Sequence, residues 1–305
     1  MRLKSMNRSD WPQVAELICT STNAWYQRNG KPAIFSAGPE SCLLFCEVYE
    51  DLDPGCCVVA EDETSGRLMG SCFYHPRPTH VSLGIMNVHP DFFGRGVASA
   101  LLRHITDLAD RQSLPVRLVS SAMNLNSFSL YTKAGFVPRA AFQDMLIPAP
   151  REGLNLSSAR SREVRQATPG DVPAIVELEA EVSGIRREKD YRYFLENRRG
   201  YWHVSVIEGK RGLDGFLCSI ARPASTMLGP GAMRDDESAA ALIVAELNHR
   251  RGLSPVFLVP VDRPALVQQI YAWGGRNCEI HFAQVRGGFA PFTGIVMPTF
   301  MPETA

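Results

Sequence analysis

Two glycines flank an arginine directly after a strand-like run and directly before an apolar helical pattern, in the stretch VHPDFFGRGVASALL, residues 88–102. Small residues at a helix N-terminus expose successive backbone N–H groups, where the helix macrodipole favours negative charge. The chemistry that such a turn can do is capture of an anion. A sharp turn that only glycine can make explains Gly94 and Gly96 equally well at this point, because a single Gly-x-Gly is a weak signal.

The neighbouring residues exclude two familiar phosphate-binding loops. No Gly-Lys-Ser or Gly-Lys-Thr follows the turn, so it is not a nucleotide loop of the Walker type. A dinucleotide-binding turn would have a third glycine where Ser99 stands.

The elements around the turn predict a mixed α/β (α+β) fold. Residues 55–62 and 67–75 are strand-like and are joined by a Ser-Gly turn, and residues 80–90 form a third strand. A helix is expected over residues 97–111, with one apolar face made of Val97, Leu101, Leu102, Ile105 and Leu108. Residues 115–136 read as a strand, a loop and a short helix closed by glycine. We therefore expect a sheet flanked by helices.

The chain repeats this plan once. Pro-Val-x-Leu-Val occurs at residues 115 and 255, and at the same offset of 140 (255 − 115) Tyr131 matches Tyr271 and Gly135 matches Gly275. An Asp-x-Pro signature of a helix N-terminus stands near the start of each copy, at Asp10 and Asp171. We predict two similar domains, residues 1–150 and 162–305, with the Pro-, Ser- and Gly-rich stretch between them as the boundary.

Composition excludes several classes of partner. The chain of 305 residues carries 32 acidic and 32 basic side chains, so nothing calls for nucleic acid or an anionic membrane surface. No apolar run approaches a membrane span, and we expect a soluble cytoplasmic protein. None of the eight cysteines forms a Cys-x-x-Cys pair, so we expect no metal site, and Cys42 and Cys46 are interpreted as small buried residues.

Residues 80–136 resemble the acyl-CoA-binding core of the GNAT family, the GCN5-related N-acetyltransferases. The family signature is a strand ending in Val-x-Pro, then Gln/Arg-x-x-Gly-x-Gly/Ala and a helix. Here it reads Val88-His89-Pro90 followed by residues 93–98, and a later Asn-to-Tyr segment spans Asn124 to Tyr131 and closes at Gly135-Phe136. Phe93 departs from the pattern, because the family prefers Gln or Arg there.

The resemblance implies two tandem GNAT-like domains, each with a mixed, mostly antiparallel sheet flanked by helices, and acetyl-CoA as co-substrate. Main-chain groups of Asn87 and Val88 would align the pantetheine arm as an added strand would. Backbone amides would hold the pyrophosphate in the turn made of Phe93, Gly94, Arg95, Gly96, Val97, Ala98 and Ser99. Asn124, with Ser127 in the same segment, would bind the cofactor arm, and Tyr131 would protonate the departing thiolate. From the residues alone, Asn124 could instead cap a turn and Tyr131 could be a packed aromatic.

The second domain should keep the fold without the cofactor. At the offset of 140, Gly94 maps to Arg234, Gly96 to Asp236 and Asn124 to Pro264. Acid at the helix start repels a pyrophosphate, and proline offers no amide N–H. A displaced turn around Pro230 is the weaker alternative, since that proline removes a donor.

The leading interpretation is an N-acetyltransferase that moves acetyl directly to a primary amine of a small molecule or peptide. The third strand offers Ser82, Gly84 and Asn87, none of them a good base, and His75 and His80 are nearby candidates. The alternative is an acyl-CoA-binding sensor or scaffold without chemistry. The second domain would cap the acceptor site or form the face of a homodimer, and the sequence leaves both open.

Overall fold

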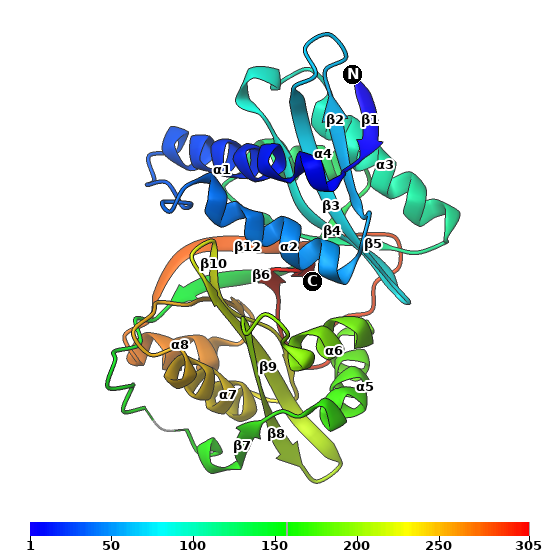
Figure 1. Cartoon of the computed structure of the whole chain (residues 1–305). Helices are drawn as coiled ribbons and strands as arrows, with labels where there is room; N and C mark the ends of the chain where they lie inside the picture. Colours follow the sequence, from blue (N-terminus) through cyan, green and yellow to red (C-terminus); the bar gives the residue numbers. More distant parts are fainter. Residues whose placement is uncertain (157, 305) are drawn as a thin grey trace. The chain divides into compact units, whose positions relative to one another are not determined.

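The computed structural model describes residues 1–156 and 158–304, which form two compact units (Figure 1). The first unit comprises residues 1–76, 80–116 and 300–303, and the second comprises 77–79, 117–299 and the end of the chain. No helix among the described residues is long and apolar enough to cross a membrane.

The glycine turn lies in the first unit, which contributes four neighbouring strands. Its elements are β1 (Arg2–Ser5), α1 (Trp11–Arg28), α2 (Leu43–Leu52), β2 (Cys57–Glu61), β3 (Leu68–Arg77), β4 (His80–Val88) and α3 (Val97–Arg111), with 3-10 turns at Arg8–Asp10, Pro39–Cys42 and Pro90–Phe92. The strands follow the order β1-β2-β3-β4. Helix α1 contacts α2 and β4, and α3 contacts β2 and β4 (Figure 1).

The second unit has more strands because it receives the last strands of the first repeat. Its elements are β5 (Val116–Ser121), α4 (Leu125–Lys133), β6 (Val137–Leu146), β7 (Val164–Gln166), α5 (Val172–Ser183), α6 (Glu188–Glu196), β8 (Trp202–Gly209), β9 (Gly212–Arg222), β10 (Ser225–Met233), α7 (Asp236–His249), β11 (Val256–Pro260), α8 (Pro264–Ala272), β12 (Arg276–Arg286) and β13 (Ile295–Met297). Short 3-10 turns occur at Ser161–Glu163 and Pro169–Asp171. Strands β14 (Thr299–Phe300) and β15 (Glu303–Thr304) pair with each other, and each has one residue in either unit.

The two repeats exchange strands inside the second unit. The strand order there is β5-β12-β6-β11-β10-β9-β8-β7, so β12 of the second repeat lies between β5 and β6 of the first, and β6 lies between β12 and β11. Strand β6 is antiparallel to both neighbours, pairing Phe142 with Pro260 on one edge and with His281 on the other. Residues 117–149 therefore pack with the second repeat, and the compact units divide within β5 rather than at the linker. The boundary of the sequence repeat at 150–162 stays a prediction.

The predicted fold class is confirmed. The elements of the first repeat recur in the same order in the second. Strands β1, β2 and β3 pair antiparallel, as do β7, β8, β9 and β10, and β6 is antiparallel to β11 and β12, whereas β10 and β11 are parallel. Asp10 and Asp171 precede α1 and α5, each with proline in the first helical turn, as the sequence predicts. Each Asp side chain also closes a capping box on the preceding 3-10 turn.

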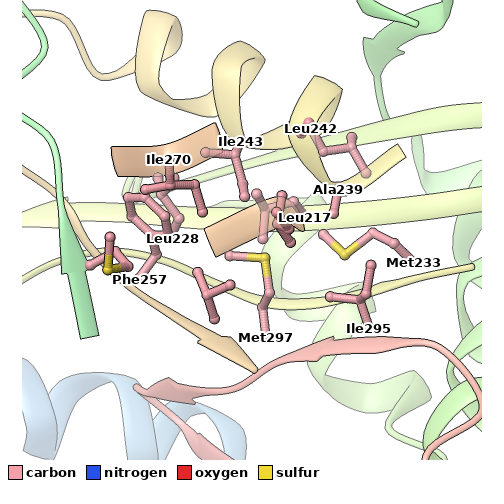
Figure 2. Close-up of a cluster of buried hydrophobic side chains, with 14 of the residues drawn as sticks. Leu217, Leu228, Met233, Ala239, Leu242, Ile243, Phe257, Ile270, Ile295 and Met297 are labelled. Carbon is pink, nitrogen blue, oxygen red and sulfur yellow. The ribbon is translucent and has the colours of Figure 1, made fainter. Parts of the chain in front are cut away.

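A large apolar core lies between α7, α8 and the strands of the second unit. Figure 2 shows that side chains of α7, β9, β10 and β11 meet Ile270 of α8 and Met297 of β13. In the first unit, α3 buries Val97, Leu101, Leu102 and Ile105, and Leu108 is only half-buried. Cys42 and Cys46 are both fully buried, as expected, and burial raises the pKa of Cys46 to about 12.

Candidate functional site

The glycine turn has a backbone that other residues adopt only with strain. After β4 and a short 3-10 turn, Gly94 has a φ of +77° and Gly96 a φ of +78°. A Cβ on either glycine would meet no atom within 4 Å, so the requirement is the left-handed conformation and not lack of room. The sharp-turn interpretation is thus correct for the backbone. It is compatible with anion capture, because the turn is what opens the helix start.

The first backbone N–H groups of α3 have no helical carbonyl as a hydrogen-bond acceptor. The N–H of Ala100 donates to the carbonyl of Gly96 at 3.0 Å, which is the first bond of the helical ladder. The N–H groups of Val97, Ala98 and Ser99 precede it and have no carbonyl one turn back. Among the described residues, no side chain caps this helix at Gly96. The start of α3 therefore presents donors and a partial positive charge, which together suit an anion.

Arginines surround the turn through contacts that the sequence pattern did not indicate. The Arg28 guanidinium, at the end of α1, lies 5.4 Å from the centre of the Phe93 ring. The guanidinium of Arg95 lies 5.3 Å from the Phe92 ring, and that of Arg67 lies at the same distance. Arg67 also pairs with an exposed aspartate.

Two of these guanidiniums remain available to a ligand. Within residues 1–156 and 158–304, no carboxylate lies within ion-pair distance of Arg28 or Arg95. Phe93 is 47% exposed and lies beneath Arg28, so positive charge stands at the position where the family signature has Gln or Arg.

The end of β4 is tied to α1 through Asn87. Its Nδ2 donates to Ser21 Oγ at 2.7 Å and to Thr22 Oγ1 at 3.2 Å. The side chain is buried, and its Oδ1 accepts no hydrogen bond from the described residues. Val88 follows as the last residue of β4, and the next N–H, of His89, donates to Met69 in β3. The main chain of Asn87 and Val88 thus lies at the strand end that leads directly into the turn.

The two candidate bases are buried and engaged. His75 Nδ1 lies 2.7 Å from Asp53 Oδ2, and its ring packs edge-on against Tyr49. His80 Nε2 lies 3.1 Å from Ser82 Oγ. Both rings are at most 2% exposed, which favours the structural interpretation of these histidines.

Asn124, Ser127 and Tyr131 lie in the second unit, on α4. Asn124 is the N-cap of this helix, and its Oδ1 accepts from the N–H of Ser127 at 3.1 Å. This confirms the capping role and leaves the Nδ2 group of Asn124 as the donor for a ligand. Tyr131 is 7% exposed, with its ring 5.8 Å from that of Phe136. That these three residues and the turn of the first unit form one site stays a prediction.

The corresponding helix start in the second repeat is filled by the chain itself. Asp235 is the N-cap of α7, and its Oδ1 accepts from the N–H of Ser238 at 2.7 Å. Arg160 Nη1 donates to Ser238 Oγ at 2.7 Å. A carboxylate therefore occupies the place that an anion would take. Gly229 and Gly231 lie within β10, beside a bulge, so the alternative of a displaced turn before the helix is wrong.

The offset of 140 is wrong by one residue at the helices. The N-caps align Gly96 with Asp235 and Asn124 with Arg263, an offset of 139, instead of Asp236 and Pro264. Gly135 and Gly274 share a φ near +88°.

Tyr131 consequently corresponds to the fully buried Ile270, and not to Tyr271. Tyr271 is 45% exposed, and its hydroxyl donates to Gln143. The second repeat thus has no hydroxyl where the first has Tyr131.

A buried polar cluster in the second unit was not predicted. Asp144, Glu279 and His281 each have a carboxylate oxygen or ring nitrogen that could bind a metal ion. These atoms lie within 4.8 Å of one another, and all three side chains are buried. His281 Nδ1 lies 2.9 Å from Asp144 Oδ1. The residues come from β6 and β12, which only the strand exchange brings together, so their spacing in the sequence gave no signal.

Comparisons with known proteins agree with this geometry. Residues 11–136 match the model of the Acetyltransferase (GNAT) family. The structure of a Pyrococcus horikoshii protein classed with the acetyltransferases aligns with a TM-score of 0.75 over 99% of this chain and 95% of that one, at 15% identity. A GCN5-related N-acetyltransferase from Sphaerobacter thermophilus aligns with a TM-score of 0.62 over 96% and 98%, at 18% identity.

A tandem GNAT protein from the clavulanic acid biosynthesis pathway aligns with a TM-score of 0.57 over 93% of this chain and 97% of that one, at 14% identity. At these identities the likeness concerns the fold. In sequence, the UPF0157 protein YqkA of Bacillus subtilis (strain 168) is 32% identical over 72 residues, which are 24% of this chain and 21% of that protein.

Proposed function

We propose that this protein transfers acetyl from acetyl-CoA directly to a primary amine of a small molecule or peptide. The proposal is supported by the match of residues 11–136 to the model of the GNAT acetyltransferase family and by the fold that the chain shares with GNAT proteins, one of them a tandem protein. The observation that carries this proposal is the open start of α3. Three backbone amides there have no helical partner, while the guanidiniums of Arg28 and Arg95 lie against Phe93 and Phe92 with no carboxylate of the described residues within ion-pair distance. Several such contacts converging on one pyrophosphate would decide where the cofactor binds.

Direct transfer needs a neutral amine and a proton for the leaving thiolate. The amine nitrogen bonds to the thioester carbon, the carbon–sulfur bond breaks, and the sulfur takes a proton from the Tyr131 hydroxyl. A tyrosine with the reference pKa of about 10 donating to a thiol of about 8.5 makes this step uphill by roughly 2 kcal/mol. Positioning can overcome a cost of this size. The proton lost by the amine goes to water, which also reprotonates Tyr131.

The acceptor is an amine of low pKa on this proposal. His75 and His80 are engaged with Asp53 and Ser82, so β4 and its neighbour supply no evident base. Deprotonating a lysine-like amine of pKa about 10.4 at pH 7 costs roughly 4.6 kcal/mol, whereas an α-amino group of about 7.7–8 costs only about 1 kcal/mol. An α-amine or a similarly weak base is therefore favoured over a lysine side chain.

The test is acetyl-CoA turnover on a panel of amines that spans this pKa range, followed as release of free thiol. We expect Tyr131→Phe to bind acetyl-CoA normally and to turn over about 10²–10⁴-fold more slowly, the usual contribution of a positioned acid. Gly96→Asp should weaken acetyl-CoA binding by at least a few hundredfold at low salt. Tight acetyl-CoA binding with no acceptor-dependent thiol release from any amine would instead favour a sensor. Normal binding by Gly96→Asp would refute the cofactor site.

A further inference from the structure

The turn that carries Asn124 is attached to a strand of the second repeat. The N–H of Ala122, just beyond β5, donates to the carbonyl of Ile280 in β12 at 2.8 Å. Ser120 Oγ donates to Gln284 Oε1 of the same strand at 2.8 Å. The end of β5 is therefore fixed by β12 on both sides of Ser121.

Ser121 links a buried carboxylate to this turn. Its hydroxyl donates to Glu279 Oε1 and accepts from the N–H of Met123 at 3.1 Å. Its carbonyl accepts from the N–H of Asn124 at 3.3 Å. A hydroxyl that donates to a carboxylate is polarised, so it accepts the Met123 bond more strongly. Glu279 thus acts on the backbone of residues 121–124 through a single side chain.

The surrounding cluster keeps Glu279 directed at Ser121. Glu279 faces Asp144 directly in the register of β12 and β6. Like charges in that arrangement repel. His281 pairs with Asp144 at 2.9 Å and so binds the competing carboxylate. Glu279 itself is 9% exposed, which limits the competition from water for its oxygen atoms.

We propose that Glu279 is a positioning residue for the cofactor site of the first repeat. Through Ser121 it sets the turn so that the Asn124 amide, whose Oδ1 caps α4, directs its Nδ2 to the pantetheine arm of acetyl-CoA. This rests on the proposed function. It also gives the second repeat a task, because a chain half without its own cofactor cradle supplies the group that completes the other half's site.

The experiment compares binding of two ligands to the full chain by calorimetry. One is acetyl-CoA, and the other is adenosine 3′-phosphate 5′-diphosphate, which keeps the three phosphates and lacks the pantetheine arm. We expect Glu279→Ala and Ser121→Ala each to raise the Kd of acetyl-CoA about tenfold, the size of one hydrogen bond to a charged group. The Kd of the fragment should stay within about twofold. Glu279→Gln retains an acceptor oxygen and should restore most of the affinity.

Three further readouts separate positioning from general damage. The double variant should bind acetyl-CoA about as weakly as either single one, since both act through one contact. Thermal unfolding midpoints identify a misfolded variant, and Glu181→Gln, at an exposed ion pair of the second repeat, is the control.

The proposal is overturned if Glu279→Ala binds acetyl-CoA as the wild type does, or if it loses both ligands equally. It is also overturned if EDTA reproduces the loss, since Asp144, Glu279 and His281 would then act as a metal site. A wild type that binds neither ligand refutes the proposed function instead.

Discussion

Replacing Gly96 by aspartate and, in parallel, by asparagine separates charge from backbone conformation at the glycine turn. Both side chains fit, because no atom lies within 4 Å of a Cβ placed there. Both residues tolerate the φ of +78° better than other residues do, so they share a strain of about 1 kcal/mol. The two variants then differ in one negative charge at the start of α3.

That charge has a calculable effect on a bound phosphate. A phosphate held by the amides of Val97–Ser99, at N–H···O distances of about 2.9 Å, would lie roughly 5 Å from a carboxylate at position 96. At an effective dielectric constant near 20, the repulsion per charge pair is about 3 kcal/mol. The aspartate variant should therefore bind acetyl-CoA a few hundredfold more weakly than the asparagine variant.

Calorimetry at low and high salt checks this difference. Screening shortens the Debye length from about 30 Å at 0.01 M to about 3 Å at 1 M, so the ratio of the two Kd values should fall steeply with salt. Asp235→Asn, at the matching helix start of the second repeat, should leave acetyl-CoA affinity unchanged, because that position already holds its own cap. Equal Kd values for the two Gly96 variants at low salt would refute the placement of phosphate at α3.

Three further outcomes are expected. Arg28→Ala should weaken acetyl-CoA binding about fivefold at low salt and less at high salt, as calorimetry would show; no change would remove Arg28 from the site. Glu179→Ala strips the partner from a buried arginine and should lower the free energy of unfolding in urea by about 3–5 kcal/mol, whereas the exposed Glu177→Ala should change it little. Burial raises the pKa of Glu246, but the hydrogen bond and charge of His203, together with hydrogen bonds from two serines, outweigh burial, and the pKa lies below its ordinary 4.5. The stability from this depressed pKa is present above about pH 4.5 and is lost as pH falls through the folded value, so His203→Ala should move acid unfolding, followed by circular dichroism, to higher pH; an unchanged midpoint would contradict this.

Local patterns predicted the elements around the turn because local physics determines them. The apolar spacing after Gly96 specifies the buried face of α3, and Asp10 with its following proline specifies the start of α1. Glycine at positions 94 and 96 is consistent with the left-handed backbone conformation that both residues adopt. Each of these rests on interactions within a few residues along the chain.

The arrangement of distant residues could not be predicted in the same way. Arg28 meets Phe93 across 65 residues, and no periodicity of either segment selects that partner. The pairing of β6 with β12 likewise joins strands that are about 140 residues apart, and no pattern within either strand selects the other. The sequence did not indicate the structural offset of 139, because Tyr271 and Gly275 are the same residue types as Tyr131 and Gly135. Their exposure and φ nevertheless differ from those of Tyr131 and Gly135.

The strand exchange gives the second repeat a structural role in addition to the absence of a cofactor site that we propose for it. If β12 only covered the edge of β5, any apolar strand would do so equally well. The buried polar residues of β12 would then lower the stability of the fold. Instead Glu279, His281 and Gln284 lie on β12 and bond to β5 and β6 of the first repeat. Replacing Asp235, the cap of α7, would then affect the structure of the second repeat only. Replacing Glu279 would also affect the Asn124 turn of the first repeat. We therefore propose a division of roles between the repeats, in which the start of α3 binds the anion and β12 fixes the segment that carries Asn124.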